Sequence, residues 1–470
     1  MKNKIYGSLF FLIMTFFIVG CQSYEPAPLN IGSYRHSLET RLIEIEPVTE
    51  FVNRINATIH TPVTFDISDG ISSEEGEVFA LFYNPELRLA RLEAGVALAN
   101  FETAGLWEDP VFGFDGAEIS SPSAPFEFGL MGNFTIPISG RLKIEKTRAG
   151  SAYETSMRTL VNDEWNLRAK VRSKWAHWTS AKLEVNIIED VVIQLEQIIS
   201  IANSLREAGE INRVEHRLLQ VALASSKVHQ TEAMLQERTE EFALLGLLGL
   251  PLNNAAALNP LFPTIATKVV QDETVRIIDA NTELAIVFSK YKTAEESLRL
   301  EIKKQYPDIV IGSGYGSEFN DHRVLFGLSI PLSIWNRNQA GIAKAKAKRE
   351  VARAEAETTF ARIDRELAHA NASLLLIQTQ HAYYKNEIVP LLIQQTRDIK
   401  AIIELGEVDT FILLETITQQ HEAKHRLLEL QVAELDAKIT VLNILGPDYQ
   451  LAATPINREL PQENTLGGVQ

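Results

Sequence analysis

The sequence predicts a mainly α-helical protein in which one structural unit occurs twice and four β-strands are added. Landmark residues recur at a fixed distance, because Asn84 and the residues after it reappear at Asn281, 197 positions later. Residues 138–250 contain no proline and residues 332–446 contain only Pro390, and proline strongly disfavours a helix interior. Two short segments between helical regions alternate apolar with small or polar residues, as β-strands do. A repeat this long indicates a duplicated structural unit and not a solenoid of small repeats.

Each proline-poor region is predicted to be a long helical hairpin with a glycine at its turn. Gly209 and Gly406 occupy equivalent places, and a glycine just past a helix end readily adopts the left-handed backbone that caps it. The arms of the first hairpin are expected at about residues 140–207 and 211–248, and at ~1.5 Å per residue the longer arm would reach on the order of 100 Å. Because this arm is amphipathic, we expect it to cross an aqueous space packed against similar helices.

A shorter helix is predicted before each pair of strands. Ser72 and Glu75 have the spacing of a capping box, and the helix that they start is expected to run to about Trp107. Its counterpart in the second unit is expected between about Asp272 and Gln305. Each unit is therefore predicted to contain a helix, a pair of strands and a long helical hairpin, in that order.

The strand pairs are predicted at Val111–Ala117 with Phe126–Ile136 and at Ile309–Phe319 with Arg323–Ile330. In the last strand apolar residues occupy every second position, which is typical of a strand with lipid on one face and a lumen on the other. The alternative is an ordinary hairpin with one face packed on a protein core. Four strands cannot close a barrel, and open strand edges are not tolerated in lipid. A membrane location would therefore require several copies of the chain.

The first residues have the pattern of a secretion signal with a lipid-attachment site. Lys2 and Lys4 precede an apolar run at residues 9–19, which is shorter than the ~20 residues that a membrane helix needs. Residues 18–21 read Ile-Val-Gly-Cys and resemble the lipobox of bacterial lipoproteins, and Cys21 is the only cysteine of the chain. The resemblance implies that Cys21 is acylated, for instance with palmitate, and that the mature lipoprotein is delivered to the outer membrane.

These patterns predict six segments. They are a signal peptide at 1–20, a lipidated N-terminal linker at 21–73, a first repeat at 74–250, an equatorial linker at 251–271, a second repeat at 272–448 and a C-terminal tail at 449–470.

The charge and the scattered metal-ligating residues limit the function classes. A formal net charge of −16 argues against a nucleic-acid partner, because phosphate binding needs a basic face. It is compatible with a passage for cations. Asp398 and Glu404, near the second turn, could form acidic rings in a lumen, and a solvated helix face is the alternative. The ten histidines are scattered, so no metal centre and no cofactor are predicted.

The pattern resembles the TolC-like outer-membrane efflux protein family, whose unit of helix, β-hairpin and long helical hairpin is present twice. Residues 84–87, Asn-Pro-Glu-Leu, and residues 133–141, at a strand-to-helix junction, are similar to family landmarks. The second junction, residues 328–339, combines Ile-Pro-Leu with Asn-Arg-Asn-Gln, and Tyr-Pro-Asp stands at 306–308. This combination resembles the cobalt–zinc–cadmium (heavy-metal RND) branch of the family.

The resemblance implies a homotrimer with one twelve-stranded membrane β-barrel and a helical tunnel in the periplasm. It implies a periplasmic adaptor (membrane fusion protein) and an inner-membrane, proton-driven RND transporter as partners, heavy-metal cations as cargo, and no enzymatic activity or cofactor. The adaptor would contact the helical tips, at Gly209, Glu210, Gly406 and Glu407. Alternatives are efflux of drugs or small molecules, a type I secretion duct of the same fold, and a structural lipoprotein that does not conduct.

One motif points to a different class of protein. His421-Glu422-Ala423-Lys424-His425 matches the pattern in which two histidines one helical turn apart bind zinc and a glutamate acts as base. A lysine is unusual in the middle of this motif, and the sequence places no third ligand nearby. The segment also falls on the return arm of the second hairpin, so a zinc peptidase is the less favoured hypothesis.

Overall fold

The computed structural model describes residues 23–41, 45–56, 65–118, 126–252, 258–265, 272–318, 321–332, 334–404 and 410–447. Cys21, Gly406 and Glu407 lie outside these residues. The chain divides into two compact units, Met1–Ile45 and Glu46–Gln470. In the first unit, helix α2 (Ile31–Thr40) begins after Asn30, whose side-chain oxygen accepts a hydrogen bond of 3.1 Å from the Ser33 N–H.

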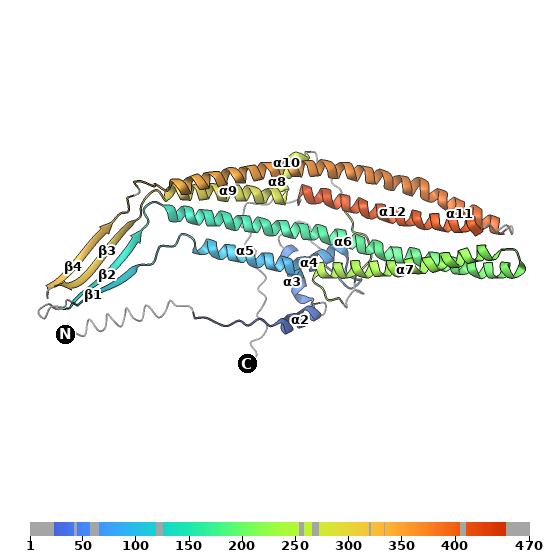
Figure 1. The fold of residues 1–470 in the computed structure, drawn as a ribbon, viewed down its shortest axis with the longest axis horizontal. Helices are drawn as coiled ribbons and strands as arrows, with labels where there is room; N and C mark the ends of the chain where they lie inside the picture. The colour runs from blue at the N-terminus through green and yellow to red at the C-terminus, as the bar shows by residue number, and fades with distance from the viewer. Residues whose placement is uncertain are drawn as a thin grey trace. The chain divides into compact units, whose positions relative to one another are not determined.

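The second unit contains the repeated helices and the strands (Figure 1). The bounds of its elements, in chain order, are α3 (Glu46–Asn56), α4 (Ser73–Tyr83), α5 (Pro85–Thr103), β1 (Val111–Ala117), β2 (Glu127–Ile136), α6 (Arg141–Ala208), α7 (Arg213–Leu248), α8 (Glu273–Ala280), α9 (Thr282–Lys303), β3 (Ile309–Glu318), β4 (Asp321–Ser329), α10 (Gln339–Tyr383), the π-helix η2 (Tyr384–Ile388), α11 (Val389–Glu404) and α12 (Thr410–Leu445). Within the described residues, no helix is long and apolar enough to cross a bilayer.

The predicted fold class is confirmed: the structure is mainly helical, and helices, strand pair and long helical hairpin occur in the same order twice. Helix α6 is one continuous helix of 68 residues, about 100 Å at ~1.5 Å per residue. The strands lie at one end of the long helices, and the turn between α6 and α7 lies at the other end (Figure 1).

The four strands form one antiparallel sheet in the order β1-β2-β3-β4, and each begins or ends within three residues of its predicted limits. The sheet joins the two repeats, because β2 of the first pairs with β3 of the second from Phe128 with Ser317 to Ile136 with Ile309. Strands β1 and β4 are the two edges.

The single helix predicted from Ser72 to Trp107 is wrong, because the chain breaks it at Asn84 into α4 and α5. Asn84 leaves the helical backbone (φ −59°, ψ 125°), and its side-chain oxygen accepts a hydrogen bond of 2.9 Å from the Leu87 N–H. Pro85 follows at the first helical position, where its missing N–H costs no hydrogen bond.

The second repeat contains the same break, between α8 and α9 at Asn281. The Asn84 amide donates to the Leu247 carbonyl at 2.9 Å, and the Asn281 amide donates to the Ile444 carbonyl at 2.7 Å. Both bonds span 163 residues. Each break is therefore tied to the end of the returning helix of its own repeat, in a contact that the duplication has kept.

Candidate functional site

The turn between α6 and α7 is a compact, exposed tip. Gly209 adopts the left-handed conformation (φ 81°), and its N–H and that of Glu210 bond to carbonyls of the last turn of α6 at 3.1 and 2.9 Å. A Cβ on Gly209 would meet no atom within 4 Å, so the glycine serves the backbone and not a packing contact. Asn212 then caps α7 through a capping box with Glu215. This cap was not among the sequence-based predictions, although its Asn-x-x-Glu spacing is visible in the sequence.

The second tip is described only up to the end of α11. Asp398 is exposed on α11. Glu404 is the last residue of that helix, and its side chain lies outside the described residues. The role of these two acids as lumen rings, and of the four tip residues as adaptor contacts, stays a prediction.

Helix α7 has an exposed apolar stripe, defined here as Val214, Val221, Val228, Leu235 and Phe242. These residues are spaced seven apart, and between 46 and 69% of each is exposed. The opposite face of α7 packs against α6 through buried residues that include Leu219, Leu244 and Leu248. A heptad of apolar residues is the pattern of a helix that packs against another helix. No described residue of the same chain covers the stripe.

The sheet has one apolar face and one face of glycine and polar residues. In an antiparallel sheet, paired residues point to the same side. The register therefore places these side chains on one face: Phe112, Phe114, Phe128, Leu130, Phe134, Ile311, Tyr315, Val324, Phe326 and Leu328. Every residue of β4 is exposed, so this face has no protein core against it there. The alternative of an ordinary core-packed hairpin does not apply to β4.

At the centre of the opposite face, the space beside the glycines of β3 is too small for a larger side chain. A Cβ on Gly316 would lie 2.8 Å from the Phe128 carbonyl oxygen, and one on Gly314 would lie 3.0 Å from the Leu130 carbonyl oxygen. A hollow of about 220 Å³ lies on this side, lined in part by Asn133 and Gly312. The predicted alternation of apolar residues with glycine and polar residues is therefore present in the folded sheet.

Large apolar side chains are exposed at all four junctions between strands and helices. They are Leu106 and Trp107 before β1, Ile138 after β2, Tyr306 before β3, and Leu332, Ile334 and Trp335 after β4. Trp335 is the most exposed of them, at 90%. Amphipathic aromatic rings at one level of a membrane protein typically mark the boundary between lipid and water.

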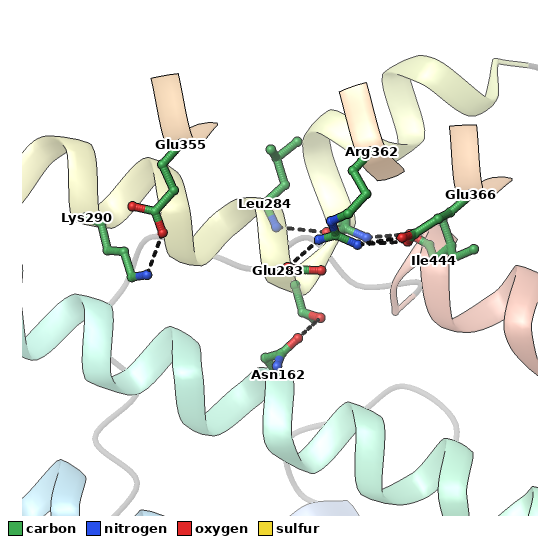
Figure 2. Close-up of polar contacts among 10 residues, drawn as sticks. Asn162, Glu283, Leu284, Lys290, Glu355, Arg362, Glu366 and Ile444 are labelled. Atoms are coloured by element: carbon green, nitrogen blue, oxygen red, sulfur yellow. Dashed lines mark hydrogen bonds and ion pairs between the residues drawn. The ribbon is translucent and has the colours of Figure 1, made fainter. Parts of the chain in front are cut away.

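Polar contacts join neighbouring helices and the two repeats (Figure 2). On α9, Glu283 pairs with Arg362 of α10, which also contacts Glu366 at 2.8 Å, and Lys290 pairs with Glu355 at 2.8 Å. The Thr282 hydroxyl donates to the Asn162 side chain of α6 at 2.8 Å, which connects the second repeat to the first.

A cavity of about 1460 Å³ lies along the seam between the repeats. Its lining includes Asp163 and Lys170 of α6, Arg365 and His369 of α10, and Asn443 of α12. Burial raises the pKa of the Asp163 carboxyl. Opposite charges line the cavity from both repeats, together with apolar side chains such as Leu87, Leu167 and Ile444.

The residues of the zinc-peptidase motif lie on α12 and are used for helix packing. His425 pairs with Glu184 of α6 at 3.0 Å and with Glu429 of its own helix at 3.3 Å. Among the described residues, no three histidine, cysteine or acidic side chains are grouped so that they could hold a metal ion. The sequence could not have found Glu184 as a neighbour, because it is more than two hundred positions away.

Known proteins with this architecture are membrane channels. The structure of CusC, described with its conformational changes on folding and transmembrane channel formation, superimposes with a TM-score of 0.69 and 18% identity, covering 83% of this chain and 97% of CusC. The CmeC outer-membrane channel of Campylobacter jejuni gives a TM-score of 0.70 and 14% identity, covering 92% of this chain and 95% of CmeC.

Sequence comparison identifies a curated relative of this chain. The cobalt-zinc-cadmium resistance protein CzcC of Cupriavidus metallidurans is 22% identical over 330 residues, covering 70% of this chain and 75% of CzcC. No family model matches the chain.

The chain has the TolC-like fold of outer-membrane efflux channels. The resemblance seen in its sequence is confirmed at this level, with CzcC as a distant relative in the heavy-metal branch. The proteins that it resembles are transport proteins and not enzymes, which agrees with the sequence-based prediction.

Proposed function

We propose that this protein is the outer-membrane channel of a tripartite efflux system and that it works as a trimer. The observation that carries the proposal is the sheet. It has an apolar face with no core against it along β4, and two edge strands, β1 and β4, that have no second partner among the described residues. A sheet in lipid needs every backbone group paired. Pairing β4 of one copy with β1 of the next satisfies both edges and closes a ring.

The apolar stripe on α7 supports the same assembly. Exposed apolar patches on a helix mark interaction surfaces. The second hairpin also exposes apolar side chains, among them Val351, Leu376, Tyr383 and Leu391. We infer that the stripe of one copy packs against the second hairpin of the next, so that the helices form a tube below the strands. The two faces differ, as a head-to-tail ring requires.

The exposed apolar residues at the strand–helix junctions supply the membrane boundary in this proposal. The sheet would lie in the outer membrane and the helices in the periplasm. Cys21 would carry the lipid anchor on the periplasmic side, and the tips at Gly209, Glu210, Gly406 and Glu407 would meet a periplasmic adaptor coupled to an RND transporter. Asp398 and Glu404 are the candidates for acidic rings near the tips.

Heavy-metal cations are the proposed cargo, supported by the relationship to CzcC and by the net charge of −16. Drug efflux or secretion through the same fold is the second candidate, because one fold can serve different cargoes. A strain that lacks the gene distinguishes them. We expect it to become sensitive to cobalt, zinc and cadmium salts, whereas sensitivity to drugs alone would identify the second candidate.

Assembly and conductance test the proposal directly. Val221→Glu with Leu235→Glu places charges in the stripe and should convert trimers into monomers in native mass spectrometry. Gln220→Glu adds a charge at an exposed polar position of α7 and should leave the trimer intact. Wild-type trimers should conduct ions in planar bilayers. A monomeric or non-conducting wild-type protein would instead indicate a structural lipoprotein.

A further inference from the structure

Two histidine–carboxylate pairs cross between the two helical hairpins. His177 of α6 contacts Asp436 of α12, with 2.8 Å between its Nε2 and the Oδ2, and the Ser173 hydroxyl donates to the other oxygen of Asp436 at 2.6 Å. Nearer the tips, His425 of α12 contacts Glu184 of α6, with 3.0 Å between Nδ1 and Oε2. Both pairs therefore join the first hairpin to α12 of the second.

Two polar contacts between α6 and α12 near the seam involve groups that do not titrate. The Asn443 amide donates to the Asn166 side chain at 3.0 Å, and the Trp165 indole donates to the Asn443 carbonyl at 3.1 Å. These contacts lie at the end of α12 that is far from the tip. Going from there toward the tip, the contacts between hairpins change from amide and indole groups to histidine and carboxylate groups.

We propose that the pairs His177–Asp436 and His425–Glu184 form a proton-dependent latch that holds α12 against α6 and releases it as the pH rises. Each pair is strongest when the histidine is a cation, because the partner is a carboxylate. Loss of the proton removes the charge attraction in both pairs, and it leaves a neutral hydrogen bond between His177 and Asp436. The latch adds a control to the proposed channel, but it does not depend on that function.

The surroundings of His177 favour its cation. The hydrogen bond to Asp436 raises the pKa of His177 and outweighs the opposing effect of burial. Glu240 of α7 adds to this effect, whereas Lys174 on the same helix opposes it. Lys174 is itself paired with Glu240 at 2.7 Å.

The surroundings of His425 give the same direction. Burial by itself would lower the pKa of His425, but the hydrogen bond and charge of Glu184, with Glu429, outweigh it and raise the pKa. The ring of His421 lies 6.2 Å away, centroid to centroid. Burial lowers the pKa of His421, and His229 of α7 contributes to the lowering. The charge of His425 also lowers the pKa of His421, so His421 loses its proton at a lower pH than His425 does.

The pH range in which the latch releases follows from the directions of the two histidine pKa shifts. A histidine whose pKa is raised in the folded state contributes fully below its ordinary value of about 6.5. The contribution disappears as the pH rises through the raised pKa. Release is therefore expected on the alkaline side of about pH 6.5.

A third histidine–carboxylate pair joins α12 to α10 of the same hairpin. Glu434 of α12 contacts His381 of α10 at 2.6 Å and Lys438 at 2.7 Å. Burial would raise the pKa of Glu434, but these partners lower it to about 2. Lys438 lies on α12 itself, so the partners of Glu434 on α10 are His381 and the Gln378 amide, which donates at 3.4 Å. This contact joins α12 to its own hairpin and is not part of the proposed latch.

Hydrogen exchange of the purified full-length protein tests the latch. Peptides from α12 are compared at about pH 6 and about pH 9 after correction for the intrinsic exchange rate. We expect corrected exchange in α12 to rise by about tenfold between the two pH values. In the double variant His177→Gln with His425→Gln, exchange should be fast at both. The control His369→Gln, on α10, should keep the wild-type pH step.

Two outcomes would overturn the proposal: a wild-type protein whose corrected exchange in α12 is the same at both pH values, or a double variant that keeps the step. The single variants Glu184→Gln and Asp436→Asn each remove one pair from the carboxylate side and should each reduce the step if the double variant does not fold. The measurement needs no conductance, so it separates failure of the latch from failure of the proposed channel.

Discussion

The two repeats share a helix break at an asparagine, but they differ in the long helical arm that leads to the tip. In the first repeat α6 runs unbroken for 68 residues. In the second, a π-helical turn, η2, separates α10 from α11 immediately before Pro390. Proline lacks an N–H, and its ring would clash with the carbonyl of Asn386 in a regular helix. The wider turn, in which the Val389 N–H bonds to the Tyr384 carbonyl five residues back, accommodates the proline.

The cores of the two repeats differ even more. Trp175 and Trp178 of α6 are fully buried and pack edge to face with 5.7 Å between ring centroids. In α10 the corresponding stretch, residues 371–375, contains no tryptophan and no buried residue, and Ala372 and Leu375 are exposed. The Trp175 indole also donates to the Asn259 carbonyl at 3.3 Å, in the segment after the first repeat.

This difference teaches that the duplication kept the hydrogen-bonded breaks but not the packing. One hydrophobic cluster of the second repeat lies around Ile277, Leu284 and Ile363, and ion pairs join α9 and α10 (Figure 2). Because of its buried tryptophan pair, we expect the first hairpin to be the more firmly packed element. The following three experiments test the comparison.

The largest effect is expected from Trp175→Ala, because it leaves a large cavity in the first repeat. Removal of a buried tryptophan typically costs about 3–5 kcal/mol of the free energy of unfolding. The matched change in the second repeat, Leu375→Ala, removes an exposed side chain and should cost less than about 0.5 kcal/mol. Thermal unfolding of the purified protein, followed by circular dichroism, measures both. Equal costs would show that the repeats are packed alike.

An intermediate effect, shared by both repeats, is expected from Gly249→Ala and Gly446→Ala. Both glycines adopt positive φ, and a Cβ would lie 2.5 Å from the Tyr83 carbonyl oxygen in the first repeat and overlap the Ala280 carbonyl in the second. Backbone strain of about 1–2 kcal/mol adds to overpacking of about 1–3 kcal/mol. Gly209→Ala, with open space around it, provides the control with strain alone. A control that unfolds as early as the two variants would refute the steric explanation.

The smallest effect is expected from Pro390→Ala, which acts only in the second repeat. It restores a donor and removes the cause of the π-turn, so we expect a change in stability within about 1 kcal/mol. Amide exchange at residues 384–390 should become slower. If exchange there is unchanged, neighbouring contacts and not the proline maintain the wider turn.

Local sequence patterns predicted most of the fold. The strands, the lengths of α6 and α7 and the turn at Gly209 followed from periodicity, proline placement and glycine, all of which act within a few residues. The helix breaks at Asn84 and Asn281 were missed, although each asparagine is a local helix cap. The bonds that tie the two breaks to the returning helices span 163 residues and are not visible in the sequence. The acidic candidates Asp398 and Glu404 and the tip contacts could be named but not tested from one chain.

The candidate interaction sites were harder to predict, because burial is a property of the folded chain. The seven-residue spacing of apolar residues on α7 can be seen in the sequence. Only the structure, in which α6 packs against the opposite face, shows that Val221 and Leu235 are exposed. The motif at His421 and His425 suggested a metal site until the fold placed Glu184 beside it.

Short-range pattern thus decides which segments become helix or strand in this protein, since backbone preferences and caps extend over a turn or two. Packing between distant segments decides which faces stay open and which histidines meet carboxylates. These contacts join residues hundreds of positions apart, such as His177 and Asp436, and no local preference encodes them.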